Sequence, residues 1–363
     1  MDDSQRGARG GGKNRHRRKK KKTANTSEAQ SETSASGRRR SVRLAALDLG
    51  TNNCRLLIAA PRGRDVRIVD AFSRIVRLGE GLSQTGALSD AAMARTIEAL
   101  GVCAEKIEKR GVTHMRCIAT QACRGAQNGV SFLEAVTRET GLAFDIITTE
   151  EEARLAVAGC AELLDKEAEA GLVFDIGGGS TELSWVRRHS IGDGADIIAW
   201  TSLPFGVVSI AEKWGGHDMS AQTYAAVVAD VREHIARIGD PAGMKNVFTA
   251  DRAHLLGTSG TVTSIAGVHL GLSRYRRDRV DGLWLTIGEA KAVTQQLCAM
   301  SFDERASEPC SGKERADLVV SGCAILEALQ LEWPASRIRV ADRGLREGIL
   351  ADLAREAAKD RKK

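Results

Sequence analysis

Two short stretches of this 363-residue chain place an aspartate beside a turn of small residues. In the first, the apolar run 44–47 reaches Asp48, and a Gly-Thr-Asn turn follows shortly after it. In the second, the apolar run 172–174 reaches Asp175, and three glycines follow. Apolar runs flank both turns, a pattern typical of two strands joined by a tight loop. Glycine amides in such a loop can donate to a phosphate, and a hard cation could bridge the aspartate to the phosphate oxygens.

A third turn of small residues has the sequence Gly-Thr-Ser-Gly-Thr at residues 257–261. Any one of the three turns has a simple alternative interpretation, a glycine-rich turn that binds no ligand. All three in one chain, two of them preceded by an aspartate, are hard to obtain by chance. The order of the turns therefore favours a phosphate-binding site built from several parts of the chain.

The composition indicates a protein with two domains of ordinary size, since 42% of the residues are hydrophobic. No apolar run approaches the roughly 18 residues that a membrane span requires, and no apolar segment of a secretory signal follows the charged N-terminus. The eight cysteines form no CxxC pair and lie mostly in apolar segments, as reduced core cysteines do. We therefore expect a cytoplasmic protein that makes no contact with membranes and has neither a zinc site nor a disulfide framework.

The positive charge is concentrated at the N-terminus. Residues 1–43 hold 14 Lys or Arg against 4 Asp or Glu, whereas the whole chain carries only +6, so the remainder is mildly acidic. We interpret residues 1–41 as a disordered basic arm. The arm could be a solubilising extension, or it could bind nucleic acid or polyphosphate without specificity and with a steep dependence on salt. Deleting it discriminates between an enzyme, which would keep its turnover, and a binding protein, which would lose its affinity.

Strand and helix patterns alternate through the rest of the chain, and the arrangement occurs twice. Strands are predicted around residues 66–72, 115–120 and 143–147, and helices over 91–110, 220–238, 315–331 and 345–358, with a further helix from Ile287. We expect an α/β fold with a domain over residues 42–165, a second over 166–363, and a cleft between them. The last helix is expected to pack back on the first domain.

Two further side chains have both a structural and a functional interpretation. Arg124 follows a strand, where it could bind phosphate in a forked geometry, although an isolated arginine there is more often a solvated surface residue. Glu152 lies three residues after Thr149, which is the spacing of a helix capping box. Near the C-terminus, the triplet 342–344 could contact the cleft or close a turn. Spacing alone leaves these alternatives open.

In their order along the chain, these motifs resemble the actin-like ATPase superfamily, and within it the exopolyphosphatase and guanosine pentaphosphate phosphatase family. The resemblance covers about residues 43–355. The segments that carry it are Asp48–Asn52 with Arg55–Leu57, Arg77–Leu82, Ala119–Thr120 with Arg124 and Asn128, Glu151–Leu155, Asp175–Glu182, Gly257–Thr261 and Leu345–Gly348. It implies two duplicated actin-like (ribonuclease H-like) ATPase domains facing each other across a cleft, and a homodimer.

The resemblance also implies roles for individual residues. Glu152 corresponds to the general base that activates water, and Arg124 to a phosphate-binding arginine. Magnesium (Mg²⁺) is expected to be held through Asp48, Asp175 and Glu182. The expected phosphate-binding residues are Gly50, Thr51, Asn52, Asn53, Arg55, Arg124, Gly177, Gly178, Ser180, Ser259, Gly260 and Thr261.

The implied activity is release of the terminal phosphate from inorganic polyphosphate, guanosine pentaphosphate, or both. Two departures from the family pattern bear on it. Asn53 stands where serine is common. The chain also ends at Lys363 without the C-terminal helical region of the long exopolyphosphatases, so we expect weaker binding of long polymers. The alternatives are a small-molecule kinase of the same superfamily and a polyphosphate- or nucleic-acid-binding protein of the same fold with little turnover.

Overall fold

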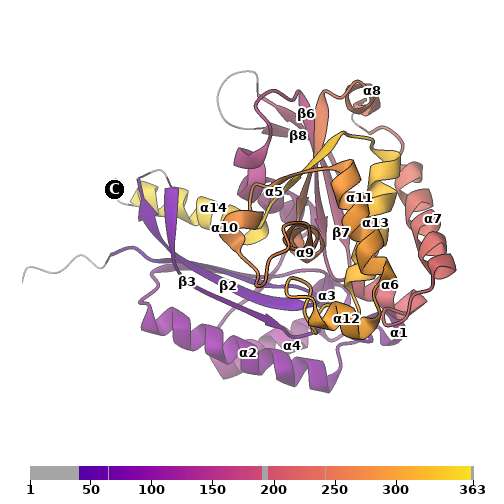
Figure 1. Ribbon diagram of the computed structural model, residues 1–363. Coiled ribbons are helices and arrows are strands. Elements are labelled where there is room, and N and C mark those ends of the chain that lie inside the picture. The colour runs from indigo at the N-terminus through magenta and orange to yellow at the C-terminus, as the bar shows by residue number, and fades with distance from the viewer. Residues whose placement is uncertain (1–40, 64, 190–194, 242, 361–363) are drawn as a thin grey trace, which may run out of the picture. The chain divides into compact units, whose positions relative to one another are not determined.

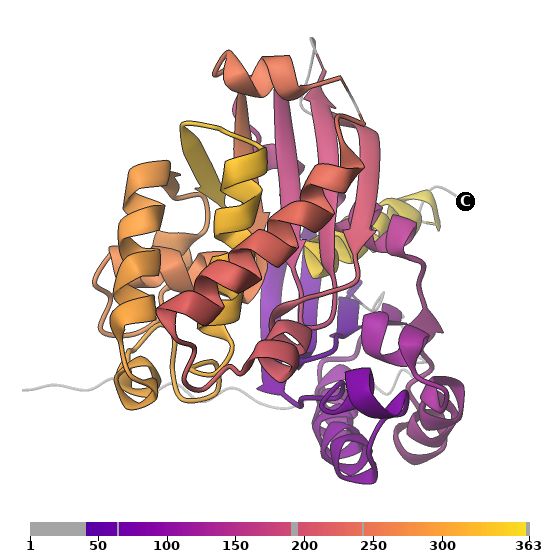
Figure 2. The same ribbon diagram turned by 90° about the vertical axis from the view of Figure 1, so that its right-hand side faces the viewer.

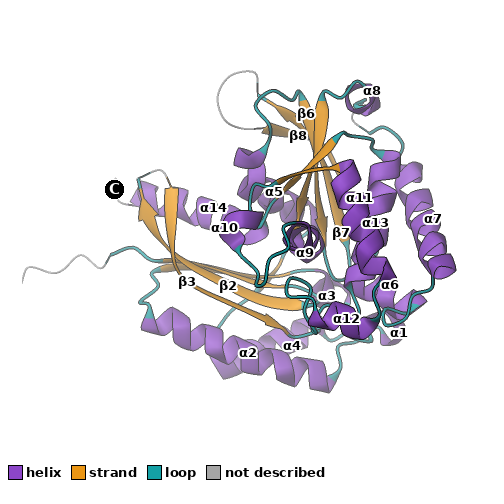
Figure 3. Cartoon of the chain, viewed as in Figure 1, coloured by secondary structure: helices purple, strands orange, loops and turns teal. Residues whose placement is uncertain are grey.

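The computed structural model describes residues 41–63, 65–189, 195–241 and 243–360, and the chain from Ser41 onward forms one compact unit. The predicted basic arm lies outside the described residues except for Ser41. Two mixed β-sheets with helices packed against them make up the unit, and Figure 3 shows the distribution of helices and strands. No helix within the described ranges is long and apolar enough to cross a membrane.

The first sheet has five strands, of which the central one ends in the first aspartate turn. Their spatial order is β3 (Asp65–Ile75), β2 (Asn53–Arg62), β1 (Leu44–Leu49), β4 (His114–Ala119) and β5 (Asp145–Ile146). Strand β1 runs antiparallel to β2 and parallel to β4. Asp48 lies one residue before the end of β1, opposite Arg55 on one side and Ile118 on the other.

The first sheet is covered on both faces, which explains why β1 is apolar at almost every position. Ala45, Leu47 and Leu49 pack in a core with α2 (Asp90–Lys109) and α4 (Gly129–Thr140). Leu44 and Ala46 face the opposite side, where α5 (Thr149–Cys160) and α14 (Leu345–Asp360) lie. Figure 1 shows α2 and α4 beneath this sheet and α14 above it. The C-terminal helix thus packs on the sheet formed by the N-terminal part of the unit.

The second sheet repeats the topology of the first. Its order is β10 (Trp284–Thr286), β11 (Arg337–Val340), β9 (Ala253–Thr258), β6 (Ala170–Ile176), β7 (Thr181–Arg188) and β8 (Ala195–Leu203). Strand β6 runs antiparallel to β7 and parallel to β9, as β1 does to β2 and β4. The order β8-β7-β6-β9-β11 in the second sheet corresponds to the order β3-β2-β1-β4-β5 in the first. Strand β10 is an additional strand at the edge of the second sheet. The repeat places Asp175 on the strand equivalent to that of Asp48.

Helices α7 (Ala221–Ile238), α9 (Ser259–His269), α11 (Ile287–Ala299) and α13 (Val319–Glu332) bury one face of the second sheet, as Figure 2 shows. The core there includes Trp185 on β7 and Trp333 after α13, whose rings meet edge to face at 5.1 Å. The other face packs on α5 through Val157 and Cys160, while Leu155 of the same helix packs on the first sheet. Helix α5 therefore contacts both sheets.

Helices α5 and α14 cross at glycines, which brings their backbones close together. A Cβ atom on Gly348 would collide with the carbonyl oxygen of Leu155, and one on Gly159 would collide with that of Gly344. Only glycine permits this approach. The crossing fixes the start of α14 against the helix that carries Glu152.

Short helices connect these elements: α1 (Leu82–Thr85), α3 (Gln121–Gly125), α6 (Val207–Trp214), α8 (Lys245–Thr249), α10 (Arg277–Val280), α12 (Phe302–Ser307) and the 3₁₀ turn Ala161–Leu163. The predicted helices over 91–110, 220–238 and 345–358 and the helix start at Ile287 are confirmed within two residues. The prediction for 315–331 was wrong at its N-terminus, since α13 begins at Val319. Residues 312–318 instead form turns, in which the Arg315 amide donates to the Gly312 carbonyl at 3.1 Å.

Candidate active site

The two aspartate turns are closed by equivalent backbone hydrogen bonds. In the first, the Gly50 amide donates to the Asn53 carbonyl at 2.9 Å, and in the second the Gly177 amide donates to the Ser180 carbonyl at 2.9 Å. Each bond closes the loop between two antiparallel strands. The predicted pair of tight hairpins is therefore confirmed.

The tips of these turns touch each other across the space between the two sheets. A Cβ atom on Gly178 would lie 2.9 Å from the Cβ of Thr51 and 3.2 Å from the amide nitrogen of Asn52, closer than ordinary packing allows. On the first-sheet side, the Thr51 hydroxyl donates to Gln121 Oε1 at 3.0 Å. The meeting of the turns requires glycine in the second one.

A cavity of about 710 Å³ lies at this meeting point. It is lined by Asp48, Gly50, Thr51, Asn52, Asn53, Arg55, Glu152, Asp175, Gly177, Gly178, Ser180, Glu182, Ser259, Gly260 and Thr261, which are all the predicted site residues except Arg124. Among the lining atoms, Asn52 Oδ1, Asn53 Oδ1 and Ser311 Oγ are buried without a hydrogen-bond partner. Buried polar atoms are rarely left unpaired in proteins, so these atoms mark where a polar ligand would bind.

Glu152 reaches the cavity from the first turn of α5. Burial raises the pKa of its carboxyl well above the usual value, and the charge of nearby Glu182 raises it further. The alternative interpretation of Thr149 and Glu152 as a capping box was wrong. The helix is capped by Thr148, whose hydroxyl accepts from the Glu151 amide at 3.2 Å, so the Glu152 side chain is free to face the cavity.

Arg124 lies next to Glu152 rather than in the wall of the cavity. Its two terminal nitrogens both donate to Glu152 Oε2 at 3.2 Å, and Nη1 also donates to the Ile147 carbonyl at 2.7 Å. The charge of Arg124 lowers the pKa of Glu152 against the effect of burial. The alternative of a freely solvated arginine is thereby wrong, whereas phosphate binding by Arg124 stays a prediction.

The three carboxylates expected to hold Mg²⁺ are all in the cavity wall. Burial raises the pKa of Asp48 to about 6 and that of Glu182 to about 7, and it also raises that of Asp175. Oxygen ligands of this kind suit magnesium. Across the described part of the chain, no three His, Cys, Asp or Glu side chains converge closely enough to hold a metal ion. Magnesium at these carboxylates therefore stays a prediction, and an ion there would share its coordination with a bound phosphate and water, as Mg²⁺ commonly does.

The third turn connects β9 to α9 and continues the cavity wall. Ser259 has a left-handed backbone conformation with φ of 75°, which is uncommon outside glycine. Its hydroxyl donates to the Ile176 carbonyl at 2.7 Å, at the end of the strand that carries Asp175. The amides of Gly260 and Thr261 begin a helix, where the backbone dipoles favour a negatively charged ligand.

Sequence reasoning missed part of a cationic wall on the cavity. Arg55 was predicted, but Arg315 and Arg346 also line the cavity. Burial lowers the pKa of both, and the charge of Arg55 lowers each further, so Arg55 lies close enough to each of the other two to repel it. Within the described residues none of the three forms an ion pair with a carboxylate. Three partly buried arginines without an ion pair to a carboxylate favour an anionic ligand.

The sequence patterns around Arg315 and Arg346 explain why neither residue was predicted to line the site. Arg346 belongs to the motif 345–348, to which only a resemblance was attached, without a role for the arginine. Arg315 was assigned to the start of a predicted helix, whereas it lies in the turns before α13.

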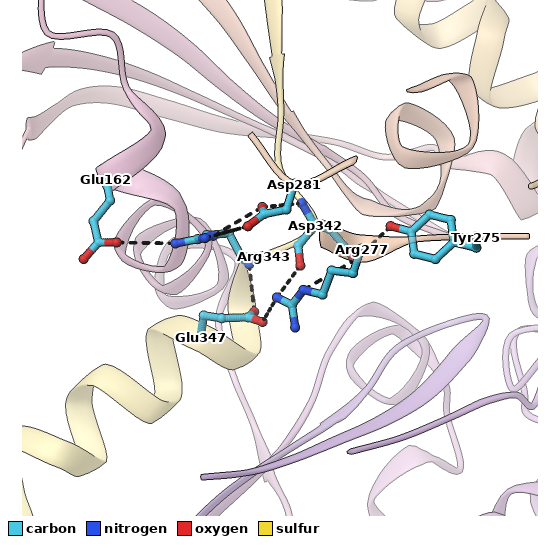
Figure 4. A network of polar contacts seen from close by, with 8 residues as sticks. Glu162, Tyr275, Arg277, Asp281, Asp342, Arg343 and Glu347 are labelled. Atoms are coloured by element: carbon cyan, nitrogen blue, oxygen red, sulfur yellow. Dashed lines mark hydrogen bonds and ion pairs between the residues drawn. The ribbon is translucent and has the colours of Figure 1, made fainter. Parts of the chain in front are cut away.

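A network of charged side chains fixes the turn before α14, as Figure 4 shows. Arg343 Nε and Nη2 donate to Asp281 Oδ2 at 3.0 and 2.5 Å, and Arg277 donates to Glu347 at 2.7 Å. The Tyr275 hydroxyl donates to Asp342 Oδ2 at 2.7 Å. Asp342 and Arg343 thus do both things left open by the sequence: they line the cavity and they hold a turn.

Comparison with known proteins places this geometry in a family. A family model described as the Ppx/GppA phosphatase family matches residues 57–357, which is most of the chain. The chain belongs to the Ppx/GppA phosphatase family. The resemblance inferred from the motifs is therefore confirmed.

Two curated members of the Ppx/GppA family illustrate how much of the chain is shared. Exopolyphosphatase 2 of Mycobacterium tuberculosis is 29% identical over 328 residues, which are 86% of this chain and 98% of that protein. The guanosine-5'-triphosphate,3'-diphosphate pyrophosphatase of Aliivibrio fischeri is 30% identical over 319 residues, 87% of this chain. The chain spans only 60% of the length of that second relative.

Solved structures of the family share the fold. The Aquifex aeolicus PPX-GPPA enzyme is 28% identical, with a TM-score of 0.70 over 86% of this chain and 99% of that one. An exopolyphosphatase from Cytophaga hutchinsonii, 23% identical, has a TM-score of 0.77 over 86% of this chain and 98% of that one, a likeness of fold alone. The expected fold class, duplicated actin-like α/β domains with a cleft, is confirmed. The domain boundary near residue 165 stays a prediction.

Proposed function

We propose that this protein hydrolyses the terminal phosphoanhydride bond of inorganic polyphosphate or guanosine pentaphosphate. The observation that carries the proposal is the position of the Glu152 carboxylate, which faces a cavity formed where two glycine turns from equivalent strands of two sheets meet. A base, a set of amide donors and a cationic wall in one cavity are the groups that phosphoryl transfer to water requires.

Glu152 would orient the attacking water and accept its proton. A carboxylate with an ordinary pKa is a weak base at neutral pH, and burial raises the pKa of Glu152, which makes its carboxylate a stronger base. The ion pair with Arg124 favours the charged carboxylate and restricts its rotation. Arg124 in this account is a positioning residue, and its predicted contact with phosphate would add to that role.

The backbone turns and arginines would bind the substrate oxygens. Amides in the turns 50–53 and 177–180 can donate to the terminal phosphoryl group, where negative charge is carried through the reaction. Arg55, Arg315 and Arg346 offer more positive charge than a single phosphate needs, which supports a substrate with several phosphates in a row.

Asp48, Asp175 and Glu182 would hold Mg²⁺ together with the substrate. When bound there, the ion would offset charge on the phosphates and relieve the repulsion among the buried carboxylates. The relatives support the choice of substrates, because the names of the curated members refer to polyphosphate in one case and to guanosine pentaphosphate in the other.

The test is a phosphate-release assay on long polyphosphate, short polyphosphate and guanosine pentaphosphate, run side by side with magnesium and the purified chain. We expect inorganic phosphate from at least one of these substrates without any added acceptor. ADP formation from ATP that depends on an added acceptor would instead identify a kinase. Tight binding of all three substrates with no phosphate release would identify a binding protein.

A further inference from the structure

The segment after β3 supports the first turn through its backbone. The amides of Val76 and Arg77 both donate to the Asn52 carbonyl, at 2.9 and 3.0 Å, and the Gly79 amide donates to the Thr51 carbonyl at 2.9 Å. A Cβ atom on Gly79 would collide with the Thr51 methyl group. The position of the first turn therefore depends directly on residues 76–79.

The same segment is anchored within the first-sheet side of the molecule. Arg95 of α2 donates to the carbonyl oxygens of Val76 at 2.7 Å and Arg77 at 3.3 Å, and it forms an ion pair with Glu80 at 3.0 Å. Arg77 has a left-handed backbone with φ of 47°, a conformation that is uncommon for a residue with a Cβ and must be held by its surroundings.

The side chain of Arg77 crosses to the other wall of the cavity. Its two terminal nitrogens bind the two carboxylate oxygens of Asp317 at 2.9 and 3.1 Å, and Nη2 also donates to the Glu314 carbonyl at 3.3 Å. A bidentate pair of this kind fixes orientation as well as distance. The two contacts lie on either side of Arg315, which lines the cavity.

Residues 311–315 are also held from the second-sheet side, where Arg315 Nη1 donates to the Ser264 hydroxyl oxygen at 3.4 Å. They line the cavity as a run of turns between Cys310 and α13, and they leave the Ser311 hydroxyl unpaired. Arg305 and Glu308 hold the ends of the turn region, through the Ala316 carbonyl at 2.9 Å and the Ser311 amide at 2.6 Å. From the first-sheet side, the Arg77 side chain reaches this turn region through Glu314 and Asp317.

We propose that Arg77 is a positioning residue that couples the first phosphate turn to the segment carrying Arg315. Through its backbone it holds the turn 50–53, and through its side chain it holds residues 314–317, so one residue sets the separation of two opposite cavity walls. The proposal rests on the proposed function, because the walls are assigned to successive phosphates of the substrate. Arg77 itself lies outside the cavity lining and acts through Arg315.

The loss of Arg77 should leave the fold intact. A second contact joins the same stretch to the second-sheet side, where Glu212 accepts from the Gly81 amide at 2.8 Å and the Ser83 hydroxyl at 2.5 Å. The Arg77 and Asp317 side chains are 35% and 24% exposed, so truncation leaves no fully buried charge. The effect of the variant should therefore be local to the segment 311–318.

The experiment compares Arg77→Ala, Arg77→Lys, Asp317→Ala and the double variant Arg77→Ala/Asp317→Ala with the parent chain. Arg74→Ala is the matched control: Arg74 lies on β3 and its ion pair with Glu98 at 2.8 Å stays within the first-sheet side. We expect each single alanine variant to raise KM for the preferred substrate roughly tenfold, with kcat changed less than about threefold. The double variant should be no worse than the singles, since they remove the same interaction. The KM of Arg77→Lys should lie between that of the parent chain and that of Arg77→Ala.

Hydrogen exchange provides a readout independent of turnover. Amides of residues 311–318 should exchange faster in Arg77→Ala and Asp317→Ala and be unchanged in Arg74→Ala, with melting temperatures close to that of the parent. Unchanged KM and unchanged exchange in Arg77→Ala would overturn the inference, as would effects that add in the double variant. If the parent chain releases no phosphate at all, the proposed function fails, while the exchange measurement still decides whether Arg77 holds the segment.

Discussion

Glu152 experiences two opposing effects on its pKa. Burial and the charge of Glu182 raise it, whereas the charge of Arg124 lowers it. A general base must be deprotonated to accept a proton from water, so the acidic limb of the pH profile of kcat/KM should report this pKa.

Replacing Arg124 with alanine should raise the pKa of Glu152 and move the acidic limb to higher pH. The sign follows because a neighbouring positive charge stabilises the carboxylate, and its loss favours the protonated, inactive form. We expect a shift of about one pH unit or more. The control is Arg116→Ala, which removes one of the two arginine partners of the adjacent Glu151, at 3.0 Å, and should leave the limb in place. A higher KM with an unmoved limb would instead support direct phosphate binding by Arg124.

The contact between the two turns is the feature that brings equivalent elements of the two sheets together. Gly178 fits against Thr51 and Asn52 with no space for a side chain. Because the turns would supply amides to the same phosphoryl group, separating them should harm activity more than stability.

Gly178→Ala is expected to lower kcat/KM roughly tenfold or more, since an added methyl group must push the turns apart and small displacements of binding groups are costly in catalysis. Gly101→Ala in α2 is the matched control, because a Cβ there meets nothing within 4 Å. Steady-state kinetics and melting curves of both variants check the prediction. Parent-like kinetics in Gly178→Ala would show that the contact between the turns is not needed for binding the phosphoryl group.

At the level of elements, local sequence patterns predicted the hairpins and most helix starts well. Ser89 and Ser220 cap α2 and α7 by accepting from backbone amides three residues later, which is a purely local signal. The start of α13 was missed because residues 315–318 have helical periodicity, but Arg315 and Asp317 make long-range contacts that no local pattern contains. The structural alternative for Glu152, a capping box with Thr149, was wrong because the cap of α5 is Thr148, one residue earlier.

At the level of the whole molecule, the cavity is assembled from segments far apart in the sequence. The two aspartate turns could be predicted because a duplicated fold repeats the same local pattern. The place of Arg346 in the cationic wall could not, since it depends on how α14 packs on the first sheet and on the network of Arg277, Asp281 and Arg343, which fixes the turn before that helix. The fold was thus more predictable than the full set of charges that face the substrate.

The central claim is that the cavity between the two turns performs hydrolysis with Glu152 as its base. The most direct measurement is phosphate release by the parent chain and by Glu152→Gln, paired with equilibrium binding of the same substrate. Glutamine keeps the shape of the side chain but cannot accept the proton from water. The account predicts a loss of turnover of roughly 100-fold or more with affinity nearly unchanged. Full turnover in Glu152→Gln would contradict it.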